Sequence, residues 1–257
     1  MRRPIVMLHG AFCGAWAFQP FADFFRAAGY ECHAQDLPFH GARWTPAHAS
    51  ELAKMSLLDY FDDIKSLIKS IDEPPVVFGH SMGGLLAQKL AADDLISGAV
   101  LLAPSSPWGV MPASANEFVS AQGLLWLMGD YWNGVLDPQF DIAAKQALDQ
   151  LPRELQSQVF SKFTPESGLA TFEIMHWLFD HRRASAVNAH DVKIPMLFIA
   201  GARDRVNHPD TVRRTARRYR SNADFLTAHG HSHWLVGEPG WESIAKTSLN
   251  WMISKGL

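Results

Sequence analysis

Residues 74–94 read PPVVFGHSMGGLLAQKLAADD, and this stretch decides the fold prediction. A short run rich in valine leads through a glycine-rich turn into a sequence typical of a helix. Gly79, Ser81 and Gly83 match the pattern G-x-S-x-G, which places a serine at a sharp turn between a strand and a helix. Such a turn favours glycine on either side of the serine and exposes the serine hydroxyl from strained backbone. The stretch predicts a nucleophilic serine if the rest of the chain supplies a base and an oxyanion site.

Short apolar runs bounded by turn residues alternate with helical patterns along most of the chain. This alternation is typical of an α/β protein in which helices cover both faces of a mostly parallel sheet. Apolar residues that recur every three or four positions predict a helix over residues 57–71, and further helices are expected near residues 20–28 and after Ser81, Asp210 and Glu238. We expect strands at residues 4–9, 31–37, 75–80, 98–104, 195–201 and 223–230.

The alternation of strand and helix patterns is interrupted between residues 106 and 189, where no strand is expected. This segment is rich in aromatic residues and methionine, and prolines interrupt its helical patterns. We predict a helical cap at residues 106–189, inserted into an α/β core formed by residues 1–105 and 190–257. Its tryptophans either form the core of the cap or line an apolar substrate pocket. The candidates for substrate binding are Trp108, Trp126, Trp132 and Trp177.

Composition excludes several classes of protein. The chain has 257 residues and a formal net charge of -3, so it has no basic excess that would favour nucleic acid as a partner. It has only two cysteines, which are too few for a disulfide framework or a four-cysteine metal site. Because no apolar run is long enough to cross a membrane, we expect a soluble, cytoplasmic protein whose oligomeric state stays open.

A serine hydroxyl needs a base to become a nucleophile at neutral pH, and the base needs an acid partner that orients it. Asp204 follows the fifth expected strand, and the sixth leads into His229, His231 and His233. Ligand sites in open parallel sheets lie at the carboxyl ends of the strands, so we expect Ser81, Asp204 and one of these histidines to meet there. The N-terminus of the helix after the serine directs free N–H groups toward the same point, as half of an oxyanion hole.

The chain resembles the α/β-hydrolase superfamily. The order serine, acid, histidine is that of the family, and HWLVGEP at residues 233–239 is similar to the loop that carries the family's catalytic histidine. The resemblance implies that Ser81, Asp204 and His233 are the catalytic residues of an esterase-like or lipase-like member with a helical cap.

Two further motifs near the start of the chain carry the same resemblance. MLHGAFCGAW at residues 7–16 is similar to the family's oxyanion loop. This implies that the backbone N–H of Ala11, with Phe12 as the alternative, joins that of Met82 in the oxyanion hole. QDLPFHGARW at residues 35–44 resembles a turn in which many members have D-L-P-G-x-G, with Phe39 in place of the first glycine. Because the chain opens at the strand before the oxyanion loop, the family's first two strands are expected to be absent.

Several alternatives stay open. Asp210 is a second candidate for the acid, and His229 or His231 for the base. The pattern H-x-H-x-H places alternate side chains on one face of an extended segment, which suits zinc, but no further ligands at suitable spacing are visible. Cys13 is either a packed small residue or a reactive thiol. The arginine-rich run at residues 213–220 is either the solvated face of a helix or an anion patch.

We expect a serine hydrolase that cleaves carboxylic esters of a small to medium acyl chain or of an aromatic acid through an acyl-enzyme. No metal and no organic cofactor are implied, and the expected partner is a small-molecule ester. The same residues would serve a thioesterase, a lactonase, an amidase or a hydrolase of C–C bonds. Two other classes on this fold are a cofactor-free lyase or oxygenase and a ligand receptor that reports binding by moving its lid.

Overall fold

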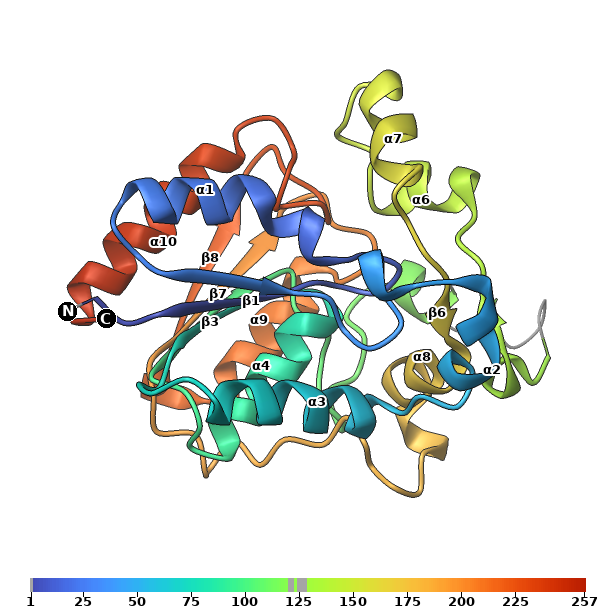
Figure 1. The fold of residues 1–257 in the computed structure, drawn as a ribbon, viewed down its shortest axis with the longest axis horizontal. Coiled ribbons are helices and arrows are strands. Elements are labelled where there is room, and N and C mark those ends of the chain that lie inside the picture. The colour runs from blue at the N-terminus through green and yellow to red at the C-terminus, as the bar shows by residue number, and fades with distance from the viewer. Residues whose placement is uncertain (1, 120–122, 124–128) are drawn as a thin grey trace.

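The computed structural model describes residues 2–119, 123 and 129–257. Within these residues, six parallel strands form one sheet in the order β2-β1-β3-β4-β7-β8 (Figure 1). All six lie inside the ranges expected from the sequence, so the predicted α/β-hydrolase architecture is confirmed. The strands are β1 Ile5–Leu8, β2 Cys32–Gln35, β3 Val76–His80, β4 Gly98–Leu102, β7 Met196–Gly201 and β8 Ala223–Ala228.

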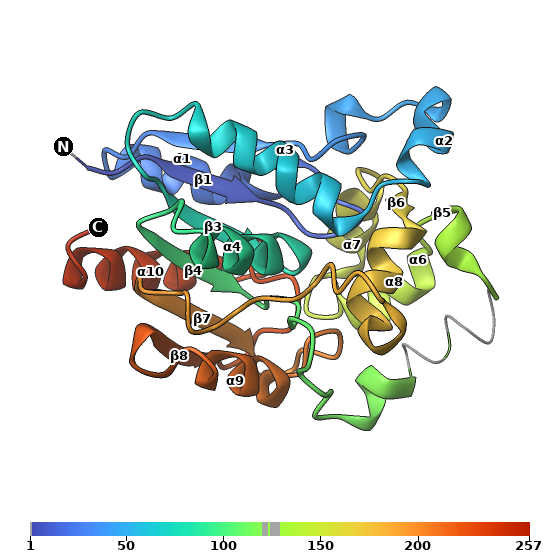
Figure 2. The ribbon, with the colours of Figure 1, turned by 90° about the horizontal axis from the view of Figure 1, so that it is seen from below.

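Helices cover both faces of the sheet, as Figures 1 and 2 show. One face carries α1 Gln19–Ala27 and α10 Trp241–Ser254. The other face carries α3 Leu57–Lys69, α4 Met82–Ala92 and α9 Pro209–Arg217. These helices confirm the sequence prediction to within a few residues. Short elements occupy the loops of the core: η1 Ala15–Phe18, η2 Gly41–Arg43, η3 Pro46–His48, α2 Ala49–Leu52 and η6 Arg220–Asn222.

The central strands are buried on both faces, which explains why their sequences are unbroken apolar runs. Successive side chains of a strand point to opposite faces of its sheet. In β1, Val6 and Leu8 therefore pack into the cluster that contains α3, α4 and α9. Ile5 and Met7 pack into the cluster that contains α1 and α10. The sheet separates two hydrophobic cores, and both hold the carboxyl ends of the strands in place.

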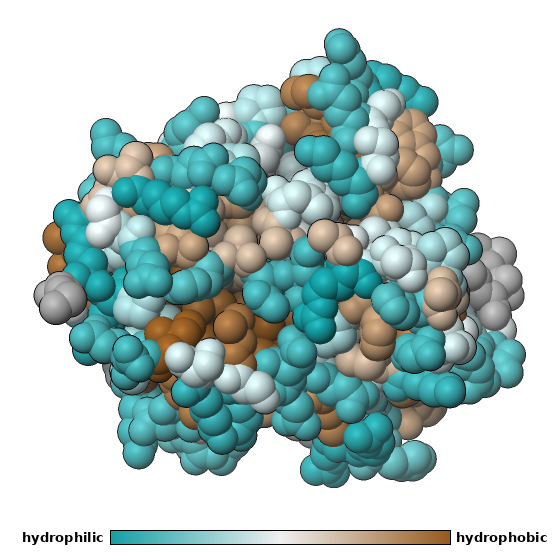
Figure 3. Space-filling model, viewed as in Figure 1, coloured by the Kyte–Doolittle hydropathy of each residue, from teal (hydrophilic) through white to brown (hydrophobic). Residues whose placement is uncertain are grey.

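Helix α3 begins at a capping box. The Ser56 hydroxyl accepts from the N–H of Leu58 at 3.1 Å, and the Asp59 carboxylate accepts from the N–H of Ser56 at 2.8 Å. The apolar face predicted from the sequence is buried against the sheet. Figure 3 shows a largely hydrophilic surface in this view, with hydrophobic side chains gathered between β1 and α3.

Residues 106–189, which we call the inserted segment, come between β4 and β7 in the sequence, and their described elements lie beside the carboxyl ends of the strands (Figure 2). An antiparallel pair of strands in this segment was not expected, because strands of two residues leave no alternating pattern in a sequence. No helix in the described part of the chain is long and apolar enough to cross a membrane. Besides the helical residues 115–119, the elements of the segment are η4 Tyr131–Asn133, β5 Val135–Leu136, α6 Phe140–Gln146, α7 Arg153–Phe160, β6 Glu166–Ser167, α8 Gly168–Met175 and η5 Trp177–Phe179.

Candidate active site

Ser81 lies in the sharp turn between β3 and α4, with φ 52° and ψ −118°. A side chain on either flanking glycine would collide with backbone. A Cβ added to Gly79 would lie 2.4 Å from the carbonyl oxygen of Gly83, and one added to Gly83 would lie 2.2 Å from that of Leu8. The glycines of G-x-S-x-G are therefore required by contact, and they allow the strained backbone that carries the serine.

The loop after β1 passes close to this turn. A Cβ added to Gly10 would lie 2.9 Å from the Cβ of Ser81, so only glycine fits there. The next residues, Ala11 and Phe12, line the same pocket as Ser81 and Met82. Met82 is the first residue of α4, and the first N–H groups of a helix have no acceptor within the helix.

Asp204 and His233 form a buried pair at the carboxyl end of the sheet. Nδ1 of His233 donates to Oδ2 of Asp204 at 2.9 Å, and the two residues are 5% and 2% exposed. Oδ1 of Asp204 accepts from the N–H groups of Val206 and Asn207 at 2.8 and 2.9 Å. These bonds fix the carboxylate and assign the Nδ1 proton, so the Nε2 atom of His233 is left to accept a proton.

The turn of Ser81 and the loop of His233 are joined through His80. Nε2 of His80 donates to the carbonyl oxygen of His233 at 2.9 Å, and the two rings lie 4.9 Å apart. Within the described residues, the Ser81 hydroxyl makes no hydrogen bond to His233. Such contacts are often long in unliganded enzymes and shorten when substrate is bound.

The three histidines of H-x-H-x-H have different surroundings. His229 is exposed, and Nδ1 of His231 lies 3.2 Å from Oε2 of Glu238. Of the three, the structure brings His233 to Asp204. Across the described ranges, no group of three or more His, Cys, Asp or Glu side chains is arranged to hold a metal ion.

Glu238 is a residue of this site that the sequence analysis did not single out. Its carboxylate accepts from the N–H of Ser232 at 2.8 Å and from that of Trp234 at 3.1 Å. These are the residues on either side of His233, so Glu238 fixes the backbone of the loop from both sides. The signal was present in HWLVGEP, where the glutamate follows the histidine by five residues.

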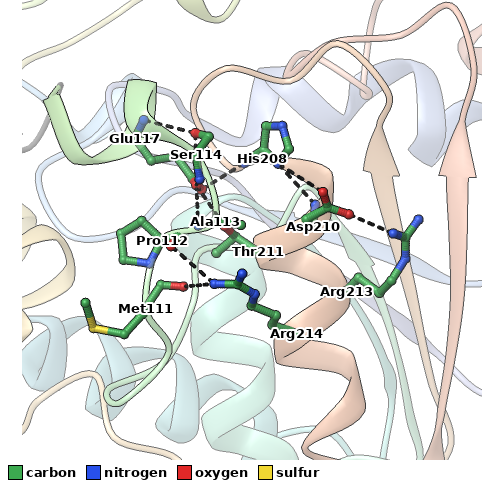
Figure 4. A network of polar contacts seen from close by, with 10 residues as sticks. All are labelled: Met111, Pro112, Ala113, Ser114, Glu117, His208, Asp210, Thr211, Arg213 and Arg214. Carbon is green, nitrogen blue, oxygen red and sulfur yellow. Dashed lines mark hydrogen bonds and ion pairs between the residues drawn. The ribbon is translucent and has the colours of Figure 1, made fainter.

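Asp210, the second candidate for the acid, lies on the surface at the start of α9. Its carboxylate pairs with Arg213 at 2.7 Å, and the side chain is 55% exposed (Figure 4). Arg213, Arg214 and Arg217 of the arginine-rich run belong to the outer face of α9, while Val212 and Ala216 of the same helix are buried. Cys13 is buried, and burial raises the pKa of its thiol, which keeps it in the unreactive protonated form.

A pocket of about 220 Å³ opens next to Ser81. Most of its wall is apolar, and half of the described lining residues come from the inserted segment, including Val110, Ile174, Met175 and Trp177. Glu117 also lies on the wall, but its oxygens accept from Thr211, from the N–H groups of Ala113, Ser114 and His208, and from the Ser114 hydroxyl (Figure 4). Protein donors surround this carboxylate, and no other charged side chain lies among the described residues of the pocket wall.

The four candidate tryptophans have different positions. Trp177 lines the pocket, and Trp108 packs against it with ring centroids 5.2 Å apart. Trp132 packs against Tyr131 and Phe172 and is not part of the described pocket wall. Trp126 lies outside the described residues.

The sequence match and the site geometry lead to the same family. The model of the alpha/beta hydrolase family matches residues 5–241, and the chain therefore belongs to this family. Caffeoylshikimate esterase from Arabidopsis thaliana is 25% identical over 253 residues, which cover 94% of this chain and 74% of that protein. Pyrethroid hydrolase from Sphingobium wenxiniae is 28% identical over 122 residues, which cover 44% of this chain and 42% of that protein.

Solved structures share the whole fold. Tomato methylketone synthase I, in complex with 2-tridecanone, has a TM-score of 0.74 and 18% identity, and the match covers 99% of both chains. A methylesterase from Arabidopsis has a TM-score of 0.74 and 17% identity, and the match covers 98% of this chain and 99% of that one. At such low identity, the likeness establishes the common fold.

Proposed function

We propose that the protein is a serine hydrolase that cleaves carboxylic esters of a small to medium acyl chain or of an aromatic acid. The observation that carries this proposal is the 2.9 Å hydrogen bond between His233 and Asp204, joined through His80 to the strained turn of Ser81. A base oriented by a buried carboxylate, and a serine that lines a pocket, are what nucleophilic acyl transfer requires.

In the proposed mechanism, Oγ of Ser81 attacks the acyl carbon while Nε2 of His233 takes the hydroxyl proton. The resulting imidazolium is stabilised by the carboxylate of Asp204. When the tetrahedral intermediate collapses, His233 gives the proton to the leaving alcohol and an acyl-enzyme remains. Water then attacks the acyl-enzyme with His233 as the base, which releases the acid and restores Ser81.

We assign the oxyanion hole to the backbone N–H groups of Met82 and Ala11. The dipole at the N-terminus of α4 favours negative charge beside Met82. Between the two candidates in the loop after β1, Ala11 is supported because the N–H of Phe12 donates to Oε2 of Glu166 at 3.4 Å. No hydrogen-bond acceptor for the N–H of Ala11 is found within the described residues.

The proposed substrate follows from the pocket. A mostly apolar wall, whose one charged side chain in the described residues is already hydrogen-bonded to protein groups, favours a neutral ester whose acyl group is aliphatic or aromatic. A volume of about 220 Å³ suits a small to medium acyl group. Two relatives carry the words esterase and methylesterase in their names, which supports ester cleavage. We further propose that residues 106–189 act as a cap over the site, with Trp177 in contact with substrate and Trp108 supporting its ring.

The test is hydrolysis of p-nitrophenyl esters from acetate to dodecanoate by the native protein and by Ser81→Ala. We expect turnover to be highest at short or medium chains and the variant to lose about a hundredfold or more in kcat. Mass spectrometry of the native protein during turnover should detect an acyl group on Ser81. A native protein that is inert across the series, or a variant that keeps its rate, contradicts the proposal. Turnover without an acyl-enzyme would point instead to a lyase or oxygenase.

A further inference from the structure

Glu166 is a fully buried carboxylate on β6 of the inserted segment. Oε1 accepts from the Tyr60 hydroxyl at 2.8 Å and from the N–H of Ser167 at 2.7 Å. Oε2 lies 3.0 Å from Nε2 of His40 and accepts from the N–H of Phe12 at 3.4 Å. Tyr60 and His40 are also fully buried. One carboxylate therefore connects the inserted segment to α3, to the loop after β2 and to the oxyanion loop.

Hydrogen-bond geometry indicates that Glu166 and His40 form an ion pair. Nδ1 of His40 lies 2.8 Å from the carbonyl oxygen of Pro38, which only accepts, so Nδ1 carries a proton. With Nε2 donating to Glu166, both ring nitrogens are protonated. Burial alone would lower the pKa of His40, but the Glu166 carboxylate raises it above the usual value. A buried charge pair of this kind is costly unless both partners are fully hydrogen-bonded, as they are here.

Phe12 has a strained backbone, with φ 63° in the left-handed region that side chains other than glycine rarely adopt. Such a conformation persists only where the surroundings hold it. Two contacts from the inserted segment do so: Glu166 accepts from the N–H of Phe12, and the carbonyl oxygen of Phe12 accepts from the N–H of Thr164 at 2.9 Å. The inserted segment therefore holds the oxyanion loop on both sides of Phe12.

Holding Phe12 also sets the orientation of Ala11. The N–H of Phe12 belongs to the peptide group that begins at the carbonyl of Ala11, and this group is planar. Fixing it limits the rotation of Ala11 and thus the direction of the preceding N–H. An oxyanion donor stabilises the transition state only when it is already aimed at the developing charge.

We propose that Glu166 is a positioning residue of the oxyanion hole, which holds the loop of Ala11 and Phe12 in its strained conformation from the inserted segment. This inference rests on the proposed function, because it assigns Glu166 a part in stabilising the oxyanion of acyl transfer. Glu166 does not itself line the pocket in the described residues, and it acts through Phe12, which does.

Glu173 provides a matched control. It is also a buried carboxylate of the inserted segment, on α8, and it accepts from the Ser56 hydroxyl and the N–H of Leu57 at 2.7 Å. Glu173 therefore ties the inserted segment to the start of α3 without contacting the oxyanion loop. Glu166→Gln and Glu173→Gln each remove one buried carboxylate charge, but only the first disturbs the support of Phe12.

The experiment measures kcat and KM on the preferred p-nitrophenyl ester, together with the binding of benzeneboronic acid, whose adduct with Ser81 mimics the tetrahedral intermediate. For Glu166→Gln we expect kcat to fall about tenfold or more while KM changes less than about twofold, as for loss of a transition-state interaction. Affinity for the boronic acid should fall by a similar factor. For Glu173→Gln we expect kcat and boronic acid affinity within about twofold of the native values, even if its melting temperature falls.

The inference is overturned if Glu166→Gln keeps the native kcat and boronic acid affinity, or if Glu173→Gln loses as much of both. If Glu166→Gln does not fold, Tyr60→Phe takes its place, because it removes one donor to Glu166 and leaves the charge. We then expect kcat to fall about threefold at unchanged KM, and an unchanged kcat would contradict the inference. The proposed function is tested separately, by ester hydrolysis with the native protein and with Ser81→Ala.

Discussion

Nε2 of His80 donates a 2.9 Å hydrogen bond to the backbone carbonyl of His233, and so joins the turn of the proposed nucleophile to the loop of the proposed base. Burial first, and then the nearby ring of His233, lower the pKa of His80 to about 3. His80 is therefore neutral at the pH at which an esterase works. A neutral ring can hold the loop in place without repelling the imidazolium that His233 forms during the proposed reaction.

Buried neutral histidines predict a loss of stability in mild acid. Burial, and then the positive charge of His40, lower the pKa of His9 to about 4, while a histidine in the unfolded chain titrates near 6.5. Between these values the unfolded state binds protons that the folded state does not, so stability falls as the pH is lowered. Between pH 6.5 and 5, we expect each of His9 and His80 to lower the free energy of unfolding by about 1–2 kcal/mol. Urea unfolding at a series of pH values measures this.

The opposite shift of His40 does not cancel this effect. Its pKa is raised in the folded state, so its contribution to stability is fully present below pH 6.5 and is lost only as the pH rises above it. His9→Asn should flatten the dependence on pH between 6.5 and 5, and His229→Asn, at an exposed position, should leave it unchanged. If the free energy of unfolding falls with pH equally steeply in the native protein and in His9→Asn, His9 is not a cause of the acid destabilisation.

Asp204→Asn should lower kcat by about a thousandfold or more with little change in stability. Oδ1 of the asparagine would keep the two N–H groups that Oδ1 of Asp204 now accepts, so its amide nitrogen would face Nδ1 of His233. Nδ1 of His233 would then have to accept a hydrogen bond from the amide. The ring proton would move to Nε2, and His233 could no longer act as the base. Asp210→Asn is the control, because this aspartate is 55% exposed. The kcat of this variant should stay within about twofold of the native value. Equal losses in both variants would remove Asp204 from its proposed role.

Glu238→Ala should reduce stability and activity together. Two buried N–H groups, those of Ser232 and Trp234, would lose their acceptor, at a cost of about 1–3 kcal/mol each. The loop of His233 would then be less well fixed, and we expect kcat to fall more than KM rises. Glu242→Ala removes an exposed glutamate from the first turn of α10 and should change stability by less than about 0.5 kcal/mol. Thermal unfolding measures the loss of stability, and ester turnover measures the loss of activity. A Glu238→Ala protein as stable as the control would refute the prediction.

Gly83→Ala should abolish activity and destabilise the fold. The new Cβ would lie 2.2 Å from the carbonyl oxygen of Leu8, and neither backbone can move without displacing β1 or α4. We expect a loss of about 1–3 kcal/mol or more in the free energy of unfolding. A Cβ on Gly134 meets nothing within 4 Å, so Gly134→Ala should be nearly neutral. Comparable melting temperatures for the two variants would show that the turn has room for a side chain.

The sequence predicted the sheet, its covering helices and the turn of Ser81 because each depends on local pattern. Valine-rich runs, glycine spacing and the apolar periodicity over 57–71 each lie in the same stretch of sequence as the element that they predict. The pairing of His233 with Asp204 could also be expected, because both follow strands whose carboxyl ends meet at one edge of the sheet.

The network of Glu166 could not be predicted in this way. Glu166 is 126 residues from His40 and 154 from Phe12, and no spacing relates residues so far apart. Its strand has two residues, which is too short for a periodic signal. Phe39 is a similar case: it adopts φ 61° where the family's turn favours glycine, and its ring packs 5.0 Å from that of His48. Its ring also packs against the core cluster of α3 and α4, which compensates a local conformation that the sequence alone would assign to glycine.

The buried ion pair of Glu166 and His40 also limits how a substrate can reach Ser81. Swinging the whole inserted segment away from the core would part the two charges and expose the strained loop at Phe12, at a cost of several kcal/mol. The segment is thus anchored at β6, and any opening of it is expected to take place away from β6. A chimera that exchanges this segment to change substrate range is expected to need Thr164 and Glu166, because both hold Phe12 in the loop of the proposed oxyanion hole.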